Sequence, residues 1–251
     1  MDEKPPRPRK RKTPAPRADV PADAQKSSGD APAGAPPEKP TQDDKALKEA
    51  VLAAALPDAA FDGFTEKVLA KAGIAEGLDQ DGIARLFPDG PPSLIEFYSL
   101  SVDAEMERRL AAMDLPRMKI RERIAAAVLA RLSILGPHKE AARRAGATLS
   151  LPMHAGLAAR LLYHTVDTMW RAVGDTSTDF NFYTKRGILA GVYGSTAMRW
   201  FNDTSENEKP TEEFLAARIE NVMQFEKFKA KAKAALSNFP AFADWAKPKP
   251  K

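Results

Sequence analysis

The stretch DTMWRAVGDTSTDFNFYTKRGILAGVYGSTAMRWFND, residues 167–203, combines an apolar helical stripe with a cluster of aromatic and charged side chains. The stripe has the three- to four-residue spacing of one helix face, and it comprises Ile188, Leu189, Val192, Tyr193, Ala197, Trp200 and Phe201. Neighbouring residues of a helix point in different directions, so the rings of Phe180, Phe182 and Tyr183 cannot all face one core. The stretch therefore predicts a core helix that exposes aromatic side chains for recognition near its start.

The helical pattern continues over the chain from residue 43 onward. No segment shows the period-two alternation of a half-buried strand, and Gly or Pro stands at the expected junctions. In the fourth helix, Ser93 is predicted as the N-cap and Glu96 completes a capping box. The predicted helices span 43–55, 64–72, 79–86, 93–112, 117–135, 138–146, 153–173, 178–202, 211–236 and 239–246. These patterns predict an all-α protein.

Composition excludes several classes of function. The 251 residues contain no Cys, which excludes disulfides, thiolate metal sites and thiol catalysis. No apolar run reaches the ~18–20 residues needed to cross a bilayer, and the N-terminus has no signal-peptide pattern. The net charge is only +4. We therefore expect a cytosolic protein that contacts a membrane only at its surface.

Both ends of the chain differ from the centre. Residues 1–42 hold ten of the 21 prolines, a composition typical of disorder, and the seven basic residues in 4–17 either attract anionic partners or only keep the tail solvated. Residues 237–251 predict a short amphipathic helix with a basic tail. This helix is expected either to touch a membrane or to dock on the body of the protein. The residues expected to make the membrane contact are Phe239, Phe242, Trp245 and Lys247.

The sequence offers no set of catalytic residues. The three histidines, His138, His154 and His164, lack the spacing of a metal site, and no phosphate-binding loop or nucleophile elbow occurs, so we expect neither an enzyme nor a metal centre. The helices within 43–90 have the rhythm of a helix–turn–helix. Asp79 and Asp81 lie where DNA phosphates would approach, so sequence-specific DNA binding is not expected.

A resemblance to a known family becomes specific within the opening stretch. Gly174-Asp175 followed by Ser177–Arg186, together with the upstream Asp167–Trp170, resembles the signature of the Coq nine family of ubiquinone-biosynthesis accessory proteins. Phe182 stands where many relatives carry Trp. The resemblance covers roughly residues 43–236. It implies a TetR-like fold, with a helix–turn–helix-like part at 43–90 and a helical lipid-binding and dimerisation domain at 91–236.

The family resemblance also implies a function. The protein would take a polyprenyl quinone precursor from the bilayer and present it to the di-iron demethoxyubiquinone hydroxylase. It would work as a homodimer at the inner membrane of a bacterium, or on the matrix side in a mitochondrion. No cofactor is implied beyond a bound isoprenoid lipid or quinone.

The implied site residues form two sets, although their apolar members also suit a solid core. The expected lipid-binding residues are Leu161, Leu162, Val166, Ile188, Leu189, Val192 and Tyr193. The expected partner-binding residues are Met169, Trp170, Asp179, Phe182, Tyr183, Lys185 and Arg186. The alternatives are a TetR-type transcriptional regulator with a hydrophobic effector, and a scaffold without a ligand.

Overall fold

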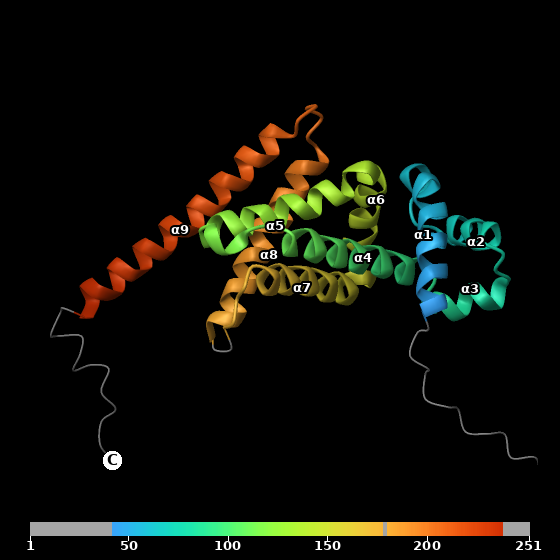
Figure 1. Ribbon diagram of the computed structural model, residues 1–251, viewed down its shortest axis with the longest axis horizontal. Coiled ribbons are helices and arrows are strands. Elements are labelled where there is room, and N and C mark those ends of the chain that lie inside the picture. The colour runs from blue at the N-terminus through green and yellow to red at the C-terminus, as the bar shows by residue number, and fades with distance from the viewer. Residues whose placement is uncertain (1–41, 178–179, 238–251) are drawn as a thin grey trace, which may run out of the picture. The chain divides into compact units, whose positions relative to one another are not determined.

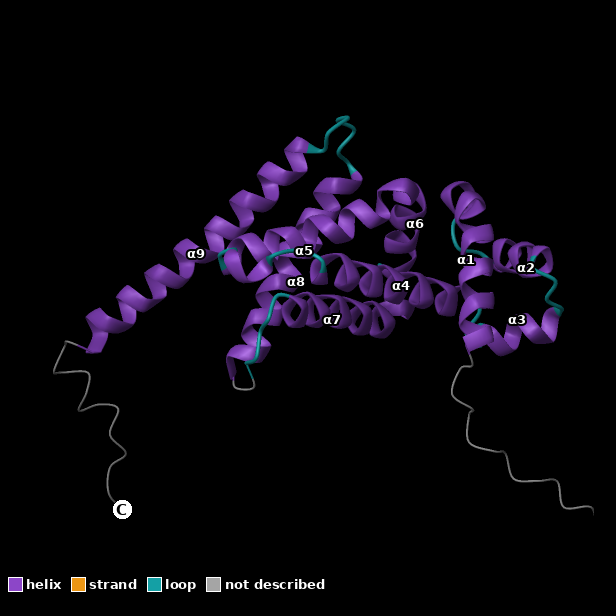
Figure 2. Ribbon diagram, in the orientation of Figure 1, coloured by secondary structure: helices purple, strands orange, loops and turns teal. Residues whose placement is uncertain are grey.

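The computed structural model describes residues 42–177 and 180–237, and every regular element within them is a helix (Figure 2). The α-helices are α1 (Gln42–Asp62), α2 (Glu66–Ala75), α3 (Gln80–Leu86), α4 (Pro91–Ala111), α5 (Ile120–Leu135), α6 (Lys139–Leu149), α7 (Ala155–Ala172), α8 (Phe180–Phe201) and α9 (Lys209–Ser237). Three short 3-10 turns lie at Leu115–Arg117, Gly136–His138 and Pro152–His154. The predicted all-α fold is confirmed. The predicted helix at 239–246 lies outside the described residues.

Helices α1–α3 form the N-terminal part, in which side chains cap the ends of the short helices. Thr65 accepts a hydrogen bond from the backbone N–H of Val68 at 3.3 Å, and Asp79 accepts one from Gly82 at 2.8 Å. Each bond satisfies an N–H that a helix start leaves without a partner. Helix α1 packs against α2 and also against α6 of the bundle (Figure 1).

Two sequence predictions about helix ends are wrong. Helix α1 was predicted to stop at residue 55 but continues through Pro57 to Asp62, because Leu56 and Ala59 on either side of the proline are buried and tertiary packing outweighs the lost hydrogen bond. Ser93 is not the N-cap of α4, whose cap is Gly90. The Ser93 hydroxyl instead accepts a bond from the Asp89 N–H, at 3.0 Å.

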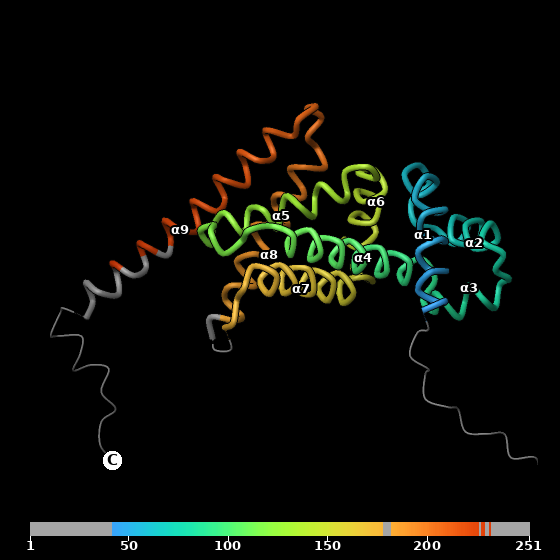
Figure 3. Tube along the Cα trace, in the orientation of Figure 1, coloured from blue at the N-terminus to red at the C-terminus, as the bar shows by residue number. Residues whose placement is uncertain are grey.

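Helices α4 to α8 form the bundle that contains most of the core (Figure 1). Helix α4 packs against α5 and α7, and α8 packs against α7 and α9. Helix α9 also contacts α5 and follows α8 after a sharp reversal of the chain (Figure 3). Trp200, Met169 and Met106 are fully buried in this core. The apolar stripe of residues 188–201 therefore lies where α8 meets its neighbours.

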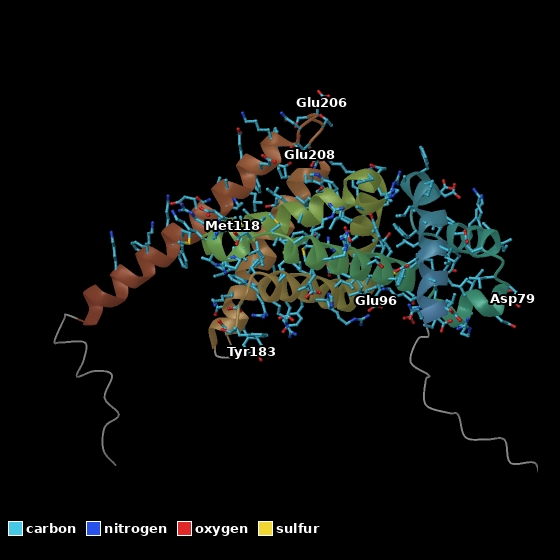
Figure 4. The ribbon with its side chains drawn as sticks, in the orientation of Figure 1. Asp79, Glu96, Met118, Tyr183, Glu206 and Glu208 are labelled. Carbon is cyan, nitrogen blue, oxygen red and sulfur yellow. The ribbon has the colours of Figure 1, made fainter. Side chains whose placement is uncertain are left out.

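The loop between α8 and α9 is fixed by acidic side chains. Asp203 accepts hydrogen bonds from the N–H groups of Ser205 and Thr211 at 3.1 and 3.0 Å, and from both of their hydroxyls. Glu208, labelled in Figure 4, accepts bonds from Trp200 Nε1 at 2.6 Å and from Lys139 Nζ at 3.1 Å. The loop thus joins α6, α8 and the start of α9.

Candidate functional site

A buried ion network holds the corner between α7 and α8. The guanidinium of Arg186 is 3% exposed; its Nε lies 2.6 Å from Asp167 Oδ1 and its Nη1 lies 3.3 Å from Asp175 Oδ2. Lys185 Nζ donates to Asp175 Oδ1 at 2.7 Å and to Ser177 Oγ at 2.6 Å. Burial raises the pKa of Asp175, but the hydrogen bonds from Lys185 and Ser177 outweigh it and lower that pKa below its usual range.

The same network fixes the aromatic residues of the corner. The Arg186 guanidinium lies over the Phe182 ring, and Trp170 Nε1 donates to the Lys185 carbonyl at 3.1 Å. The Phe182 ring in turn contacts Tyr183 edge-on, with 5.1 Å between ring centroids. Tyr183 itself is 69% exposed and labelled at the start of α8 in Figure 4. The corner therefore presents one tyrosine ring on a rigid support.

The predicted partner-binding residues differ in their exposure. Met169 and Arg186 are buried and hold the corner together, so in this structure they are not available for contact with a partner. Phe182 and Trp170 are half-buried, whereas Tyr183 and part of Lys185 reach the surface. Asp179 lies outside the described residues. We define the corner patch as Trp170, Phe182, Tyr183 and Lys185.

A half-open cavity of about 200 Å³ lies among α4, α5, α6, α7 and α8. Most of its lining is apolar, and its residues are Ile95, Tyr98, Ser99, Arg131, Leu135, Ala142, Ala145, Gly146, Leu149, Ala158, Leu161, Leu162, Thr165, Tyr193, Ala197 and Phe201. Such a cavity suits an apolar ligand that meets a few fixed polar groups.

The polar groups of this cavity belong to one network centred on Arg131. Its Nε donates to Asp103 Oδ1 at 2.7 Å, its Nη2 donates to Ser99 Oγ at 3.0 Å, and its Nη1 donates to the hydroxyl of Tyr193. Asp103 also accepts a bond from the Thr165 hydroxyl at 2.9 Å. The two buried charges are therefore paired and hydrogen-bonded, as buried charges require.

Sequence reasoning missed this network, although a signal was present. Arg131 follows Ile124 and Val128 at helical spacing, so a charge interrupts an apolar stripe of α5. Asp103 stands in the same way beside Val102 on α4. Two opposite charges within the core faces of neighbouring helices indicate a buried ion pair, because neither would be stable there alone.

The predicted lipid-binding residues lie in two places rather than one. Leu161, Leu162 and Tyr193 line the cavity around Arg131. In contrast, Ile188, Leu189 and Val192 face a groove between α8 and α9. Val166 is buried in the core and lines neither.

The α8–α9 groove consists of two connected pockets of about 100 and 450 Å³ that share three apolar residues. The shared residues are Ile188, Val192 and Val222. Gly191 borders the larger pocket, and a side chain built there would meet open space. The groove is thus a second apolar surface on α8, separate from the cavity around Arg131.

The helix–turn–helix-like part carries a charge that opposes DNA binding. Residues 42–90 contain ten acidic and five basic residues, a net charge of −5. Asp79 lies at the corner between α2 and α3 (Figure 4). Arg85 near the end of α3 donates to Asp44 Oδ1 at 2.6 Å. Phosphate contacts need an excess of Lys and Arg, which this part lacks.

The described residues contain neither a metal-binding cluster nor a membrane-spanning helix. Within 42–177 and 180–237, no group of three or more His, Asp or Glu side chains is placed to hold a metal ion. In the same part of the chain, no helix combines the length and apolarity needed to cross a membrane. The predicted membrane-contact residues Phe239, Phe242, Trp245 and Lys247 lie outside the described residues.

Comparisons with known proteins agree on one family. Residues 155–226, which include the corner patch and one wall of the cavity, match the family model described as COQ9. The chain is 31% identical over 196 residues to ubiquinone biosynthesis protein COQ9, mitochondrial, of Bos taurus, covering 76% of this chain and 61% of that protein. Residues 155–226 form a COQ9-family region.

Other relatives and one solved structure extend the comparison. The COQ9 protein of Homo sapiens is 30% identical over 196 residues, 76% of this chain and 62% of that protein. This chain thus spans about three fifths of the length of the curated relatives it matches. A TetR transcriptional regulator from Nitrosomonas europaea superposes with a TM-score of 0.56 at 19% identity, covering 70% of this chain and 97% of that one. This similarity shows the fold alone and confirms the predicted TetR-like architecture.

Proposed function

We propose that this chain is a non-catalytic, lipid-binding accessory protein of ubiquinone biosynthesis. It binds an isoprenoid quinone precursor and presents it to the demethoxyubiquinone hydroxylase at a membrane surface. The observation that carries the proposal is the position of the COQ9 match. Residues 155–226 contain the corner patch, several lining residues of the Arg131 cavity and most of the α8–α9 groove. The matched relatives are named as ubiquinone biosynthesis proteins.

The physical need for such a protein comes from the ligand. A polyprenyl chain exposes a large apolar area, which makes its transfer into water unfavourable. The α8–α9 groove offers apolar side chains that would cover part of that chain, and the Arg131 cavity offers apolar side chains to another part of the ligand. Because they lie on opposite sides of α8, a ligand has two apolar surfaces to use.

The corner patch is the proposed docking surface for the hydroxylase. Tyr183 is exposed while the network of Arg186, Asp167 and Asp175 fixes its support. Tyrosine side chains on a rigid support contribute much of the binding free energy in many protein interfaces. Burial of the ring is favourable, and few rotatable bonds lose their freedom when it binds. Lys185, part of whose side chain reaches the surface, adds a positive charge beside the ring.

Mass spectrometry of an organic extract tests the lipid-binding part of the proposal. The full chain is purified, extracted with solvent and compared with a sample that was denatured and washed before extraction. An isoprenoid quinone or precursor at close to one molecule per chain is the expected result. An extract without isoprenoid, from protein produced in cells that make ubiquinone, would remove the carrier function.

Replacing Tyr183 tests docking without damaging the corner. We choose Tyr183→Lys alone, because Phe182 stacks on Arg186 and its replacement would disturb the buried network. The variant is expected to lose at least ten-fold in hydroxylase pull-down, within the range of an aromatic hot spot. Phe61→Lys, at a 79% exposed aromatic on α1, is the matched control and should bind normally. Equal binding by both variants would refute docking at the corner.

Membrane contact and dimerisation belong to the same proposal. The aromatic residues within 239–245 would insert at the interface, with Lys247 next to anionic headgroups. Two copies joined through α8 and α9 would carry two such segments and bind more tightly through avidity. Vesicle flotation of the full chain, with and without residues 238–251, measures this contribution.

A further inference from the structure

One buried hydroxyl beside the Arg131 cavity has no partner among the residues that the structure describes. Tyr98 on α4 is 6% exposed and is one of the residues that line the cavity; its Oη is itself covered by neighbouring atoms and forms no hydrogen bond with any residue that the structure describes. Buried hydroxyls nearly always have a partner, because leaving one unpaired is unfavourable. Burial raises the pKa of Tyr98 to about 12, despite the positive charge of Arg131. The hydroxyl therefore stays protonated at physiological pH and is available as a donor.

The neighbouring charges do not call for a charged ligand. All three nitrogens of Arg131 already donate to protein oxygens, and the Asp103 carboxylate balances its charge at 2.7 Å. An anion placed here would lose its hydration without meeting an unpaired cation. A neutral oxygen loses far less hydration free energy when it enters the cavity. The polar end of the cavity therefore favours a neutral acceptor such as a carbonyl or an ether.

The size of the cavity limits the ligand further. Its volume of about 200 Å³ is below the ~300–1,000 Å³ of sites that hold whole drug-sized molecules. A long polyprenyl chain does not fit within it, whereas a single substituted ring does. Apolar side chains such as Ile95, Leu161 and Phe201 line the rest of the space.

We propose that the Arg131 cavity binds a compact, neutral ring whose oxygen accepts a hydrogen bond from Tyr98 Oη. This deepens the proposed function: the ring would be the head group of the carried quinone precursor, and the tail would leave through the open side. In the loaded protein the head group is then shielded, and presentation requires it to leave Tyr98. Tyr98 is a specificity-determining residue, because it separates rings with an acceptor oxygen from plain hydrocarbons.

A matched pair of probes tests the proposal on the full chain. The probes are 2,5-dimethyl-1,4-benzoquinone and p-xylene, which share the ring and methyl groups and differ in the two carbonyl oxygens. Calorimetric titration measures Kd for the wild type, for Tyr98→Phe and for the control Tyr163→Phe on α7, whose ring is 47% exposed and outside the cavity lining. The chain has no cysteine that would react with the quinone.

The expected outcome has two parts. Tyr98→Phe weakens quinone binding about three- to ten-fold, the effect of one hydrogen bond, and leaves p-xylene binding unchanged; Tyr163→Phe changes neither. Without a ligand, Tyr98→Phe has the same or a higher unfolding midpoint, since it removes a buried unpaired hydroxyl. The proposal is overturned if Tyr98→Phe weakens the binding of both probes equally, lowers the unfolding midpoint or leaves quinone binding unchanged. It is also overturned if the wild type binds neither probe.

The two proposals fail separately. A long-chain quinone in the solvent extract, together with a Tyr98→Phe variant that binds the quinone probe as wild type does, would keep lipid binding and overturn the role of Tyr98. If Tyr98→Phe selectively weakens binding of the quinone probe but no isoprenoid is extracted from the protein, the role of Tyr98 is supported and the carrier function is refuted.

Discussion

The guanidinium of Arg131 and the carboxylate of Asp103 join α5 to α4 inside the bundle, with 2.7 Å between Nε and Oδ1 and side-chain exposures of 6% and 1%. The pair of Arg186 with Asp175 is buried to the same extent, with side-chain exposures of 3% and 4%. The first pair lies in the wall of the Arg131 cavity, and the second lies beneath the corner patch. In this fold, each of the two candidate sites therefore contains a buried ion pair.

Replacing Asp103 by Ala is expected to lower the free energy of unfolding by about 3–5 kcal/mol, because it leaves the Arg131 charge buried without its partner. The double replacement Asp103→Leu with Arg131→Met should recover most of that loss, since no buried charge then remains. Urea unfolding at pH 7 measures both. Glu105→Ala, which removes two surface ion pairs from the same helix, is the control and should change little. A loss no larger than the control's would contradict burial of the pair.

Replacing Arg186 by Met should cost about 3 kcal/mol of unfolding free energy, because Asp167 and Asp175 both lose their buried partner. Arg186→Lys should restore only part of this, since one ammonium cannot reproduce the guanidinium fork. Lys185→Met is the matched control, and its more exposed side chain should make the loss smaller. Guanidinium unfolding followed by Trp fluorescence gives all three values. Full recovery by lysine would show that only the charge matters.

Lowering the pH should destabilise the protein through Asp203. The hydrogen bonds from Ser205 and Thr211 hold the pKa of this carboxyl well below its usual range. A group whose pKa is lower in the folded state stabilises the protein above its unfolded pKa of ~4, and the stabilisation is lost as the pH falls through the folded value. The urea midpoint of wild type should therefore fall more steeply below pH 4 than that of Asp203→Asn. Parallel curves for the two proteins would refute this role of Asp203.

The acidic helix–turn–helix-like part should not select a DNA sequence. In gel-shift experiments with the full chain, we expect any shift to be the same for genomic and scrambled duplexes and to vanish with added salt, as non-specific binding does. Asp79→Lys combined with Asp81→Lys should strengthen such binding, because it removes repulsion at the start of α3. A wild-type shift that is specific for one duplex would favour the regulator function instead.

The fold could largely be predicted from the sequence, because apolar periodicity and breakers act locally. The predicted helices at 79–86 and 178–202 correspond closely to α3 and α8. The prediction failed at Pro57, where packing on both sides of the proline overrides the local signal for a helix end. Helix ends of this kind depend on contacts made by distant parts of the chain, so the local sequence does not reveal them.

The candidate sites were only partly predictable. The motif at 179–186 correctly indicated an exposed aromatic, Tyr183, but its pattern does not tell that Arg186 turns inward to Asp167. The cavity depends on Tyr98, Arg131 and Tyr193, which come from three helices. These residues come together through tertiary packing, so their spacing along the chain does not predict that they are close.

The fixed corner between α7 and α8 also has a consequence for the speed of recognition. Since Arg186, Lys185 and Trp170 are already tied to their neighbours, an arriving protein has to immobilise little more than the Tyr183 side chain, an ordering cost of about 0.5–1.5 kcal/mol. Association then needs no slow rearrangement of backbone before productive encounters occur. Such a surface is suited to a complex that forms and dissociates repeatedly. The contacts of the Tyr183 ring would then set the lifetime of that complex.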